Sequence, residues 1–352
     1  MEELQGDIAK FDESVREFLA SHHGNKDSAK PSRGGFKGGR GSRGPRKAAK
    51  PRGDITARLS RVNQAFLAGD YTAALDLVSE VIRINAETHQ AWTALASIFR
   101  EQGEPKRALS AMVYAAHLRD KDFSGWMTCA SYAMDIIEED DDGEVMKTAR
   151  LCYSAALKAD PTSLDARLAK AAICHRQGHY SQAILEYNIA LRYAPYDLDI
   201  VRKVAETCAD NNHSEASVSS ALAAYAQFFD NAKATMPGDL GELWYDVGIY
   251  VDLFAAKSRY DDAIRELRQL SRWIVGRKSE EYWDNIHADD REWDIEPDRR
   301  AEIPEFAHHS SDNGSYGHAL PLDLRVRLAI YRFKVEAPSE AQVCQLTHPY
   351  TG

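Results

Sequence analysis

The sequence predicts an all-α protein built from stacked pairs of antiparallel helices, and three observations support this prediction. Apolar residues recur at helical spacing, so each predicted helix carries one buried stripe. The whole pattern returns after 34 residues. Glycine recurs where the first helix of a pair ends, at Gly69, Gly103 and Gly178, and Asn212 takes this place once. A period of this length indicates a solenoid, in which each unit buries its apolar face against its neighbours.

The clearest unit covers residues 89–122, and its spacing sets the register for the others. Small residues let the two helices approach closely, and large residues fill the remaining space. The residues that follow this pattern are Trp92, Leu95, Ala96 and Phe99 on the first helix and Ala108, Met112 and Ala115 on the second. The spacing is typical of the tetratricopeptide repeat (TPR), so the predicted fold is a TPR α-solenoid.

Composition and charge divide the chain into six segments. We expect a short amphipathic helix, a disordered basic tail rich in Gly and Arg, five TPR repeats, a further TPR-like helix pair, an acidic-aromatic linker and an incomplete TPR-like repeat. In order, these are residues 1–20, 21–54, 55–234, 235–278, 279–318 and 319–352. The amphipathic helix is expected to dock on its own array or to stay disordered, and docking into a partner's groove is the alternative.

The last segment is ambiguous by periodicity. Leucine and valine alternate from Leu320 to Ile330, as in a strand, but Leu324, Leu328 and Tyr331 also share one helix face. After six helix pairs, we predict the first helix of a seventh. Its second helix is missing, since EAPSEAQVCQLTHPYTG fits none. An array that stops on an apolar face is poorly soluble, so we expect a truncated chain or a misjudged exon end.

The basic tail differs from the rest of the chain in charge. Residues 21–53 hold ten basic residues and one acidic residue, a net charge of +9, so the remainder carries about −19 of the total of −10. The RGG-like pieces suit non-specific nucleic-acid contact through phosphates, and RGPRKAAKPR suits nuclear import. A basic linker without a ligand is the alternative. The residues expected to act are Arg33, Lys37, Arg40, Arg43, Arg46, Lys47, Lys50 and Arg52.

Two acidic stretches interrupt the helical pattern. Residues 138–143 lengthen the third repeat, and we expect a solvated loop, with contact to a basic partner as the alternative. Residues 280–305 combine eleven acidic side chains with Tyr282, Trp283 and Trp293. This stretch is either a disordered spacer or a segment that folds back over a basic face or occupies the array's own groove.

Several classes of protein are disfavoured by the sequence. The N-terminus is acidic and has no apolar signal-peptide core, and no apolar run of about 18 residues indicates a membrane span. The five cysteines form no C-x-x-C pair and are expected to be reduced. Nucleotide-binding, zinc-protease and serine-hydrolase motifs are missing, and the histidine pairs lack further ligands. We therefore expect no catalysis, no cofactor and no metal.

Function is then expected from binding, because a stacked array offers an extended concave groove lined by its first helices. A solvated helix face is the alternative. The candidate groove residues are Gln90, Thr93, Ser97, Arg100 and Glu101 in the second repeat and Asp165, Leu168, Ala172, His175 and Arg176 in the fourth. Co-chaperone TPR domains hold a peptide carboxylate with side chains at fixed positions of successive repeats. At the corresponding positions of this sequence only Asn63 matches, so binding of a peptide carboxylate in this way is not expected.

With these features assembled, the chain resembles the TPR-containing subunit of RNA polymerase III transcription factor IIIC, in its fungal form. The resemblance rests on GDITARLSRVNQAFLAGDYTAALDLVSEVIRIN, on AWTALASIFREQGEPKRALSAMVYAAHLRDKD with SGWMTCA after it, and on LPLDLRVRLAIYRFK after the charged linker. It covers roughly residues 53–334 and corresponds to the N-terminal portion of a longer family protein with a second TPR array.

The resemblance implies a nuclear scaffold without catalysis. In that family the TPR groove recruits transcription factor IIIB to tRNA-type genes, through its TFIIB-related and B-double-prime subunits. The other transcription factor IIIC subunits would be partners. The alternative is a TPR adaptor in RNA processing or chromatin, with the basic tail as its RNA contact.

Overall fold

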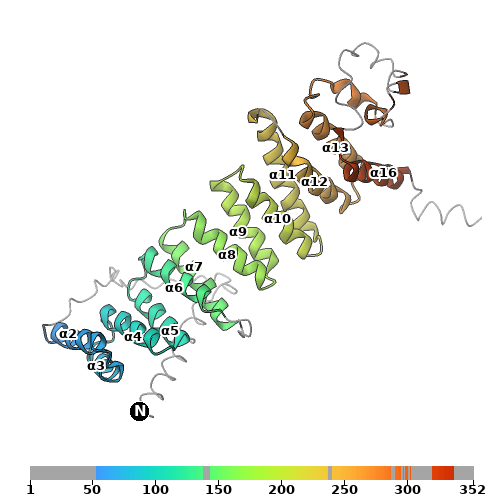
Figure 1. The fold of residues 1–352 in the computed structure, drawn as a ribbon. Coiled ribbons are helices and arrows are strands. Elements are labelled where there is room, and N and C mark those ends of the chain that lie inside the picture. Colours follow the sequence, from blue (N-terminus) through green and yellow to red (C-terminus); the bar gives the residue numbers. More distant parts are fainter. Residues whose placement is uncertain are drawn as a thin grey trace, which may run out of the picture. The chain divides into compact units, whose positions relative to one another are not determined.

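The computed structural model describes residues 53–137, 143–236, 240–286, 290–294, 296, 298, 299, 302 and 319–336. All regular elements in this part of the chain are helices, as predicted (Figure 1). The chain divides into two compact units, Met1–Ala166 and Arg167–Gly352. The amphipathic segment 1–20, the basic residues from Arg33 to Arg52 and the acidic residues 138–142 lie outside the described residues.

The first unit consists of successive helix pairs. Each helix packs on the one before it and the one after it, so the pairs stack in sequence order. The helices are α2 (Gly53–Leu67), α3 (Tyr71–Ile84), α4 (His89–Glu101), α5 (Pro105–His117), α6 (Phe123–Asp135) and α7 (Glu144–Ala159). Because α2 begins at Gly53, the last two residues of the predicted basic tail, residues 53 and 54, belong to the first helix.

The second unit continues the same pattern, with α10 packed between α9 and α11 and α13 packed on both α12 and α16. Apart from the first three residues of α8, which precede Arg167, its α-helices are α8 (Leu164–Arg176), α9 (Tyr180–Tyr193), α10 (Leu198–Asp210), α11 (Glu215–Thr235), α12 (Trp244–Ala255), α13 (Tyr260–Ile274) and α16 (Leu322–Glu336). Short 3-10 helices are η1 (Gly241–Leu243), η2 (Glu281–Asn285) and η3 (Arg291–Trp293). The ambiguous segment after Leu320 is therefore helical, as predicted.

The predicted helix ends have the left-handed backbone that their residues allow. Gly69, Gly103 and Gly178 have φ of 76°, 70° and 73°, and Asn212 has φ of 51°. Glycine has no Cβ to clash in this region, and asparagine tolerates it better than most residues. Ser258 has φ of 55° in the turn after α12 and takes the same place in the sixth pair. The sequence did not indicate this position, because serine has no marked preference for it.

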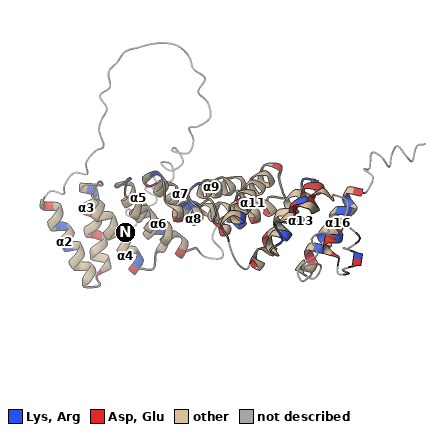
Figure 2. Cartoon of the chain, turned by 90° about the horizontal axis from the view of Figure 1, so that it is seen from above, with Lys and Arg blue, Asp and Glu red and all other residues tan. Residues whose placement is uncertain are grey.

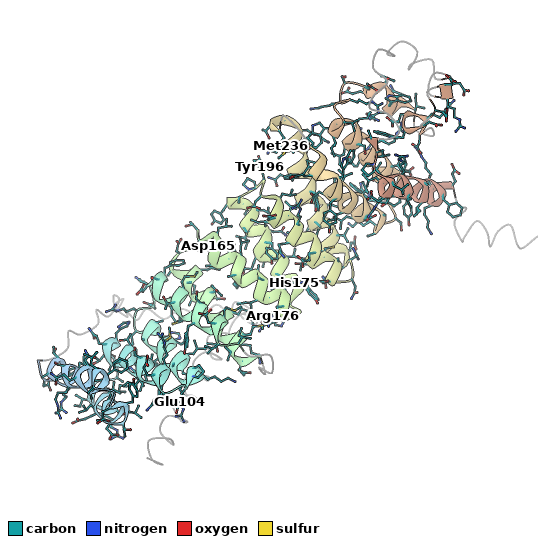
Figure 3. The ribbon with its side chains drawn as sticks, viewed as in Figure 1. Glu104, Asp165, His175, Arg176, Tyr196 and Met236 are labelled. Carbon is teal, nitrogen blue, oxygen red and sulfur yellow. The ribbon has the colours of Figure 1, made fainter. Side chains whose placement is uncertain are left out.

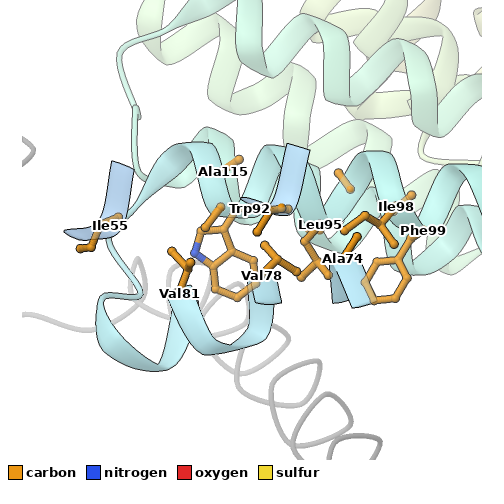
Figure 4. Close-up of a cluster of buried hydrophobic side chains, with 14 residues drawn as sticks. Ile55, Ala74, Val78, Val81, Trp92, Leu95, Ile98, Phe99 and Ala115 are labelled. Carbon is orange, nitrogen blue, oxygen red and sulfur yellow. The ribbon is translucent and has the colours of Figure 1, made fainter. Parts of the chain in front are cut away.

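Tryptophan anchors the first-unit core (Figure 4). Trp92 is 5% exposed, and its ring lies 4.1 Å from that of Tyr114, centroid to centroid. Its Nε1 donates a hydrogen bond of 2.7 Å to the carbonyl of Ala86. One repeat later, Trp126 Nε1 donates to the carbonyl of Asp120 at 3.0 Å. The indole therefore fills the core and holds the turn that precedes its helix.

The cysteines that the structure describes are buried and unpaired, in agreement with the predicted reduced thiols. They are Cys129, Cys152, Cys174 and Cys208. Burial raises the pKa of the Cys129 thiol to about 12. A thiol with so high a pKa carries almost no thiolate at neutral pH and is chemically inert.

The acidic-aromatic stretch contacts α13 through residues in the ranges 280–286 and 290–294. Trp283 in η2 is fully buried, and Trp293 in η3 is 5% exposed. Glu292 is also fully buried, and it accepts hydrogen bonds from Arg268 Nε at 2.5 Å and from Arg272 Nη1 at 3.1 Å. Residues 280–286 and 290–294 thus form no spacer: their acidic side chains meet a basic face of α13, which was the alternative interpretation.

Candidate interaction face

The candidate residues of α4 lie where the repeat register places them. Gln90, Thr93, Arg100 and Glu101 are exposed, and Ser97 is partly buried. Thr93 Oγ1 donates to the carbonyl of Gln90 at 3.0 Å, and Ser97 Oγ donates to that of Thr93 at 3.2 Å. Because both hydroxyls donate within their own helix, the longer side chains of Gln90, Arg100 and Glu101 are better placed to contact a ligand.

Arg100 links α4 to the first helix of the next repeat. Its guanidinium lies 5.7 Å from the centroid of the Tyr132 ring on α6. This cation–π contact orients the arginine along the face of the first helices. The contact joins neighbouring repeats, since Arg100 and Tyr132 are 32 residues apart in a sequence that repeats after 34.

The candidate residues of α8 are distributed along the helix. Asp165 and Arg176 are exposed and lie at opposite ends, whereas Leu168 and His175 are partly buried (Figure 3). His175 occupies the register position of Arg100, and it also reaches the first helix of the next repeat. Its Nε2 lies 2.6 Å from Asp210 Oδ2 on α10.

A buried carboxylate joins α10 to α12 in the second unit. Asp246 is fully buried, and it accepts two hydrogen bonds from Arg202, at 2.9 Å from Nε and 2.7 Å from Nη2. Tyr225 of α11 donates a third, at 3.1 Å. The hydrogen bonds to Asp246 raise the pKa of Arg202, and burial raises the pKa of Tyr225. The arginine thus stays charged and the tyrosine protonated, which is the state that satisfies the carboxylate.

A third link joins α12 to α16. Arg327 Nε donates to both carboxylate oxygens of Asp252 at 3.1 Å, and the hydroxyl of Tyr331 donates to the same carboxylate. Burial raises the pKa of Tyr331, with the bond to Asp252 as the next cause. Together with His175–Asp210 and Arg202–Asp246, this pair defines what we call the first-helix face of the second unit: the surface shared by α8, α10, α12 and α16.

Sequence reasoning gave candidate residues on α4 and α8 but missed the residues that link successive first helices, of which Tyr132 and Asp210 contact a candidate residue. The missed residues are Tyr132, Arg202, Asp210, Asp246, Asp252 and Arg327. A usable signal was the separation between partners, such as the 35 residues from His175 to Asp210. Polar residues about one repeat apart on successive first helices are candidates for such links.

Charged side chains of both signs lie on the last helices of the second unit. Basic and acidic residues are interspersed on α13 and α16 (Figure 2). Within the described ranges, no group of three or more His, Cys, Asp or Glu could hold a metal ion. The helices described in the structure include none with the length and apolar character needed to cross a membrane.

The described helix pairs form an α-solenoid of the TPR type. Residues 60–122 and 147–197 match the family model described as a tetratricopeptide repeat. These two ranges agree with the register derived from Trp92 and from the glycine positions.

The chain is homologous to subunits of transcription factor IIIC, and the predicted resemblance is thereby confirmed. It is 28% identical to transcription factor tau subunit sfc4 of Schizosaccharomyces pombe over 83% of the chain and 29% of that protein. It is 23% identical to the transcription factor tau 131 kDa subunit of Saccharomyces cerevisiae over 82% of the chain and 32% of that protein. For human general transcription factor 3C polypeptide 3, identity is 24% over 63% of the chain and 24% of that protein. The chain thus spans less than a third of the length of these relatives.

Proposed function

We propose that the chain acts as a non-catalytic scaffold in transcription factor IIIC, the assembly factor of RNA polymerase III for tRNA-type genes. The observation that carries the proposal is the similarity to three subunits of this factor, which extends over 83% of the chain in the case of sfc4. A scaffold of this kind works in the nucleus, with the other transcription factor IIIC subunits as partners.

The first-helix residues are the proposed contact for transcription factor IIIB. On α4, Gln90, Arg100 and Glu101 offer a donor, a cation and an acid within three helical turns. Such a mixed surface suits a peptide from the TFIIB-related or B-double-prime subunit that carries both charges. The basic tail would add non-specific contact to nucleic acid, and this contact would weaken steeply with salt.

Affinity purification of the protein, tagged at its own locus, tests the scaffold proposal. Mass spectrometry should recover the other transcription factor IIIC subunits together with the chain. Recovery of RNA-processing or chromatin proteins in their place would overturn the polymerase III role. It would favour the adaptor with an RNA-binding tail, a candidate that the charge of +9 on residues 21–53 supports.

A binding assay with purified transcription factor IIIB subunits tests the contact face separately. The double variant Arg100→Ala and Glu101→Ala should weaken binding about tenfold or more, since each lost charged contact costs about 1 kcal/mol or more. The matched control is Lys158→Ala, an exposed position on the second helix α7. Equal loss in both variants, or in neither, would contradict the assignment of the face. Deletion of residues 21–52 should lower nucleic-acid binding alone.

A further inference from the structure

The second helices α9 and α11 contact each other in the second unit and leave a groove between them. Two adjoining hollows of about 440 and 230 Å³ form this groove, and Asn188 and Ser220 line both of them. Asn188 Nδ2 donates a hydrogen bond of 2.5 Å to Ser220 Oγ, so this bond joins the two helices where the hollows meet. We call the two hollows together the α9–α11 groove. The larger hollow is also lined by Leu191, Arg192, Pro195, Ala223, Ala224 and Gln227.

The groove is open because α11 presents small side chains to it. Ala216, Ser220 and Ala223 recur at i, i+4 and i+7, so they lie on one face of this helix. None of them is long enough to cover the apolar side chains of α9. Leu185, which lines the smaller hollow, is accordingly 57% exposed. The groove therefore combines open apolar surface with amide and hydroxyl groups.

The charge of the groove is opposite to that of the chain. The sequence has 54 acidic and 44 basic residues. None of the described residues that line either hollow is acidic, however, and Arg192 is the charged one among them. Arg192 is exposed and forms no ion pair with any residue that the structure describes. A negatively charged ligand would therefore meet an available cation and no repelling carboxylate on the walls of the groove.

The smaller hollow lies at the N-terminal ends of both helices. Ser181 is in the first turn of α9, and Ser214 directly precedes α11. The side chains at the two N-cap positions, His179 and Ser214, accept no hydrogen bond from the first turn of their helix. Glu215 begins α11 but is exposed and lines neither hollow. Since helix N-termini carry partial positive charge, this end of the groove favours a carboxylate as well.

We propose that the α9–α11 groove binds an extended acidic peptide of a partner protein. Ser181 and Arg192 are eleven residues apart on α9. This separation is about 16 Å along the helix axis, and an extended chain covers it in about five residues. The peptide thus carries two acidic residues about five positions apart, one at the helix N-termini and one at Arg192. An apolar side chain between them enters the larger hollow.

The polar groups of the groove favour an extended peptide over a helix. An extended backbone leaves N–H and C=O groups that need partners, and Asn188, Ser220 and Gln227 can supply them. A helix satisfies its own backbone and has little use for such groups. The groove lies on second helices, so this site is separate from the first-helix contact proposed for transcription factor IIIB.

Fluorescence anisotropy with the full chain tests the proposal. The probe is the labelled peptide GDSLASDG, and the comparison peptide GKSLASKG has lysine in place of both aspartates. A short peptide makes a small contact, so protein concentrations up to about 200 μM are needed. The acidic peptide should bind at least about tenfold more tightly than the basic one. Failure of the acidic peptide to bind, or equal binding of the two peptides, would overturn the proposal.

Two substitutions in the groove should each weaken binding of the acidic peptide at least about tenfold. Arg192→Glu places a carboxylate opposite the ligand. Its matched control is Arg83→Glu, because Arg83 is the exposed basic residue in the last turn of α3, as Arg192 is in α9. Ala223→Leu fills the larger hollow, and its control is Ala234→Leu, exposed on the same helix. Unchanged binding in either groove variant, or an equal loss in its control, would contradict the assignment.

A photoreactive leucine in the acidic peptide locates the bound position on the chain. Crosslinks to residues 188–195 or 220–227 are expected, and crosslinks confined to first helices would overturn the proposal. The acidic residues 1–20 of the chain itself are the other candidate occupant. Binding that appears only after deletion of these residues would assign the groove to them and would overturn the binding of a partner.

Discussion

Replacing Glu292 with alanine tests whether the acidic segment after α13 is an integral part of the fold. Glu292 is fully buried between Arg268 and Arg272, whose side chains are 4% and 3% exposed. The substitution leaves both guanidinium groups buried beside a cavity. Arg268 keeps its bonds to the carbonyls of Trp283 and Ile286, each at 2.9 Å.

The expected loss of unfolding free energy in Glu292→Ala follows from the contacts that remain. Removing one partner of a buried ion pair typically costs about 3–5 kcal/mol, because an uncompensated charge stays behind. Arg272 retains its pair with Asp284, so the residual charge is partly balanced. We therefore expect Glu292→Ala to lower the free energy of unfolding by an amount near the lower end of this range, about 3 kcal/mol. Glu292→Gln keeps the shape but not the charge, and it should cost less than the alanine variant.

Hydrogen exchange with mass spectrometry is the suitable assay, because a repeat array does not unfold as one two-state unit. Peptides that cover α13 and residues 281–294 should exchange more than about 100-fold faster in Glu292→Ala. The control Glu281→Ala, exposed in the same segment, should match the parent. A change below about fivefold, or roughly 1 kcal/mol, would refute the view that this carboxylate holds the segment on α13.

Three further predictions concern the array itself. Trp92→Ala should lower the local stability of α4 and α5 by about 3–5 kcal/mol, as measured by hydrogen exchange of their peptides, and a loss below about 1 kcal/mol would mean that the repeat register is wrong. Ser258→Gly should raise stability by up to about 1 kcal/mol, because glycine relieves the left-handed strain at φ of 55°; a lower melting temperature would contradict this. Burial raises the pKa of Tyr187 to about 12, whereas an unfolded tyrosine ionises near 10. The unfolded chain then releases its proton first, so circular dichroism should show stability falling as pH rises above about 10; an equal fall in Tyr187→Phe, which has no proton to release at this position, would contradict this.

The helix pairs could be predicted because their determinants repeat within the sequence. A left-handed helix end excludes most residues, so Gly103, Gly178 and Asn212 mark it in the sequence itself. Ser258 shows the limit of this reasoning, because the surrounding packing imposes the same backbone on a residue that does not favour it. The period, the core positions and the class of fold followed from local spacing alone.

The contacts between repeats were harder to predict, because they depend on which side chains meet across two helices. Asp246 lies among apolar positions of α12, and nothing local indicates that Arg202 reaches it from 44 residues away. The acidic segment posed the same difficulty. Its composition is typical of a solvated spacer, yet Arg268 and Arg272 on α13 and Arg277 just after this helix bind its acidic side chains. Arginines four or five positions apart on a predicted helix were the available signal.

The links along the first-helix face have a consequence for any ligand that lies across them. Adjacent packed helices are about 8–10 Å apart, and an extended chain advances about 3.3 Å per residue. A peptide crossing α10, α12 and α16 would therefore meet a new helix at about every third of its own residues. The ion pairs Arg202–Asp246 and Asp252–Arg327 link α10 to α12 and α12 to α16 along this path. Recognition of such a ligand would depend on a three-residue period in its sequence, and inserting a single residue into the ligand would put every later contact out of step.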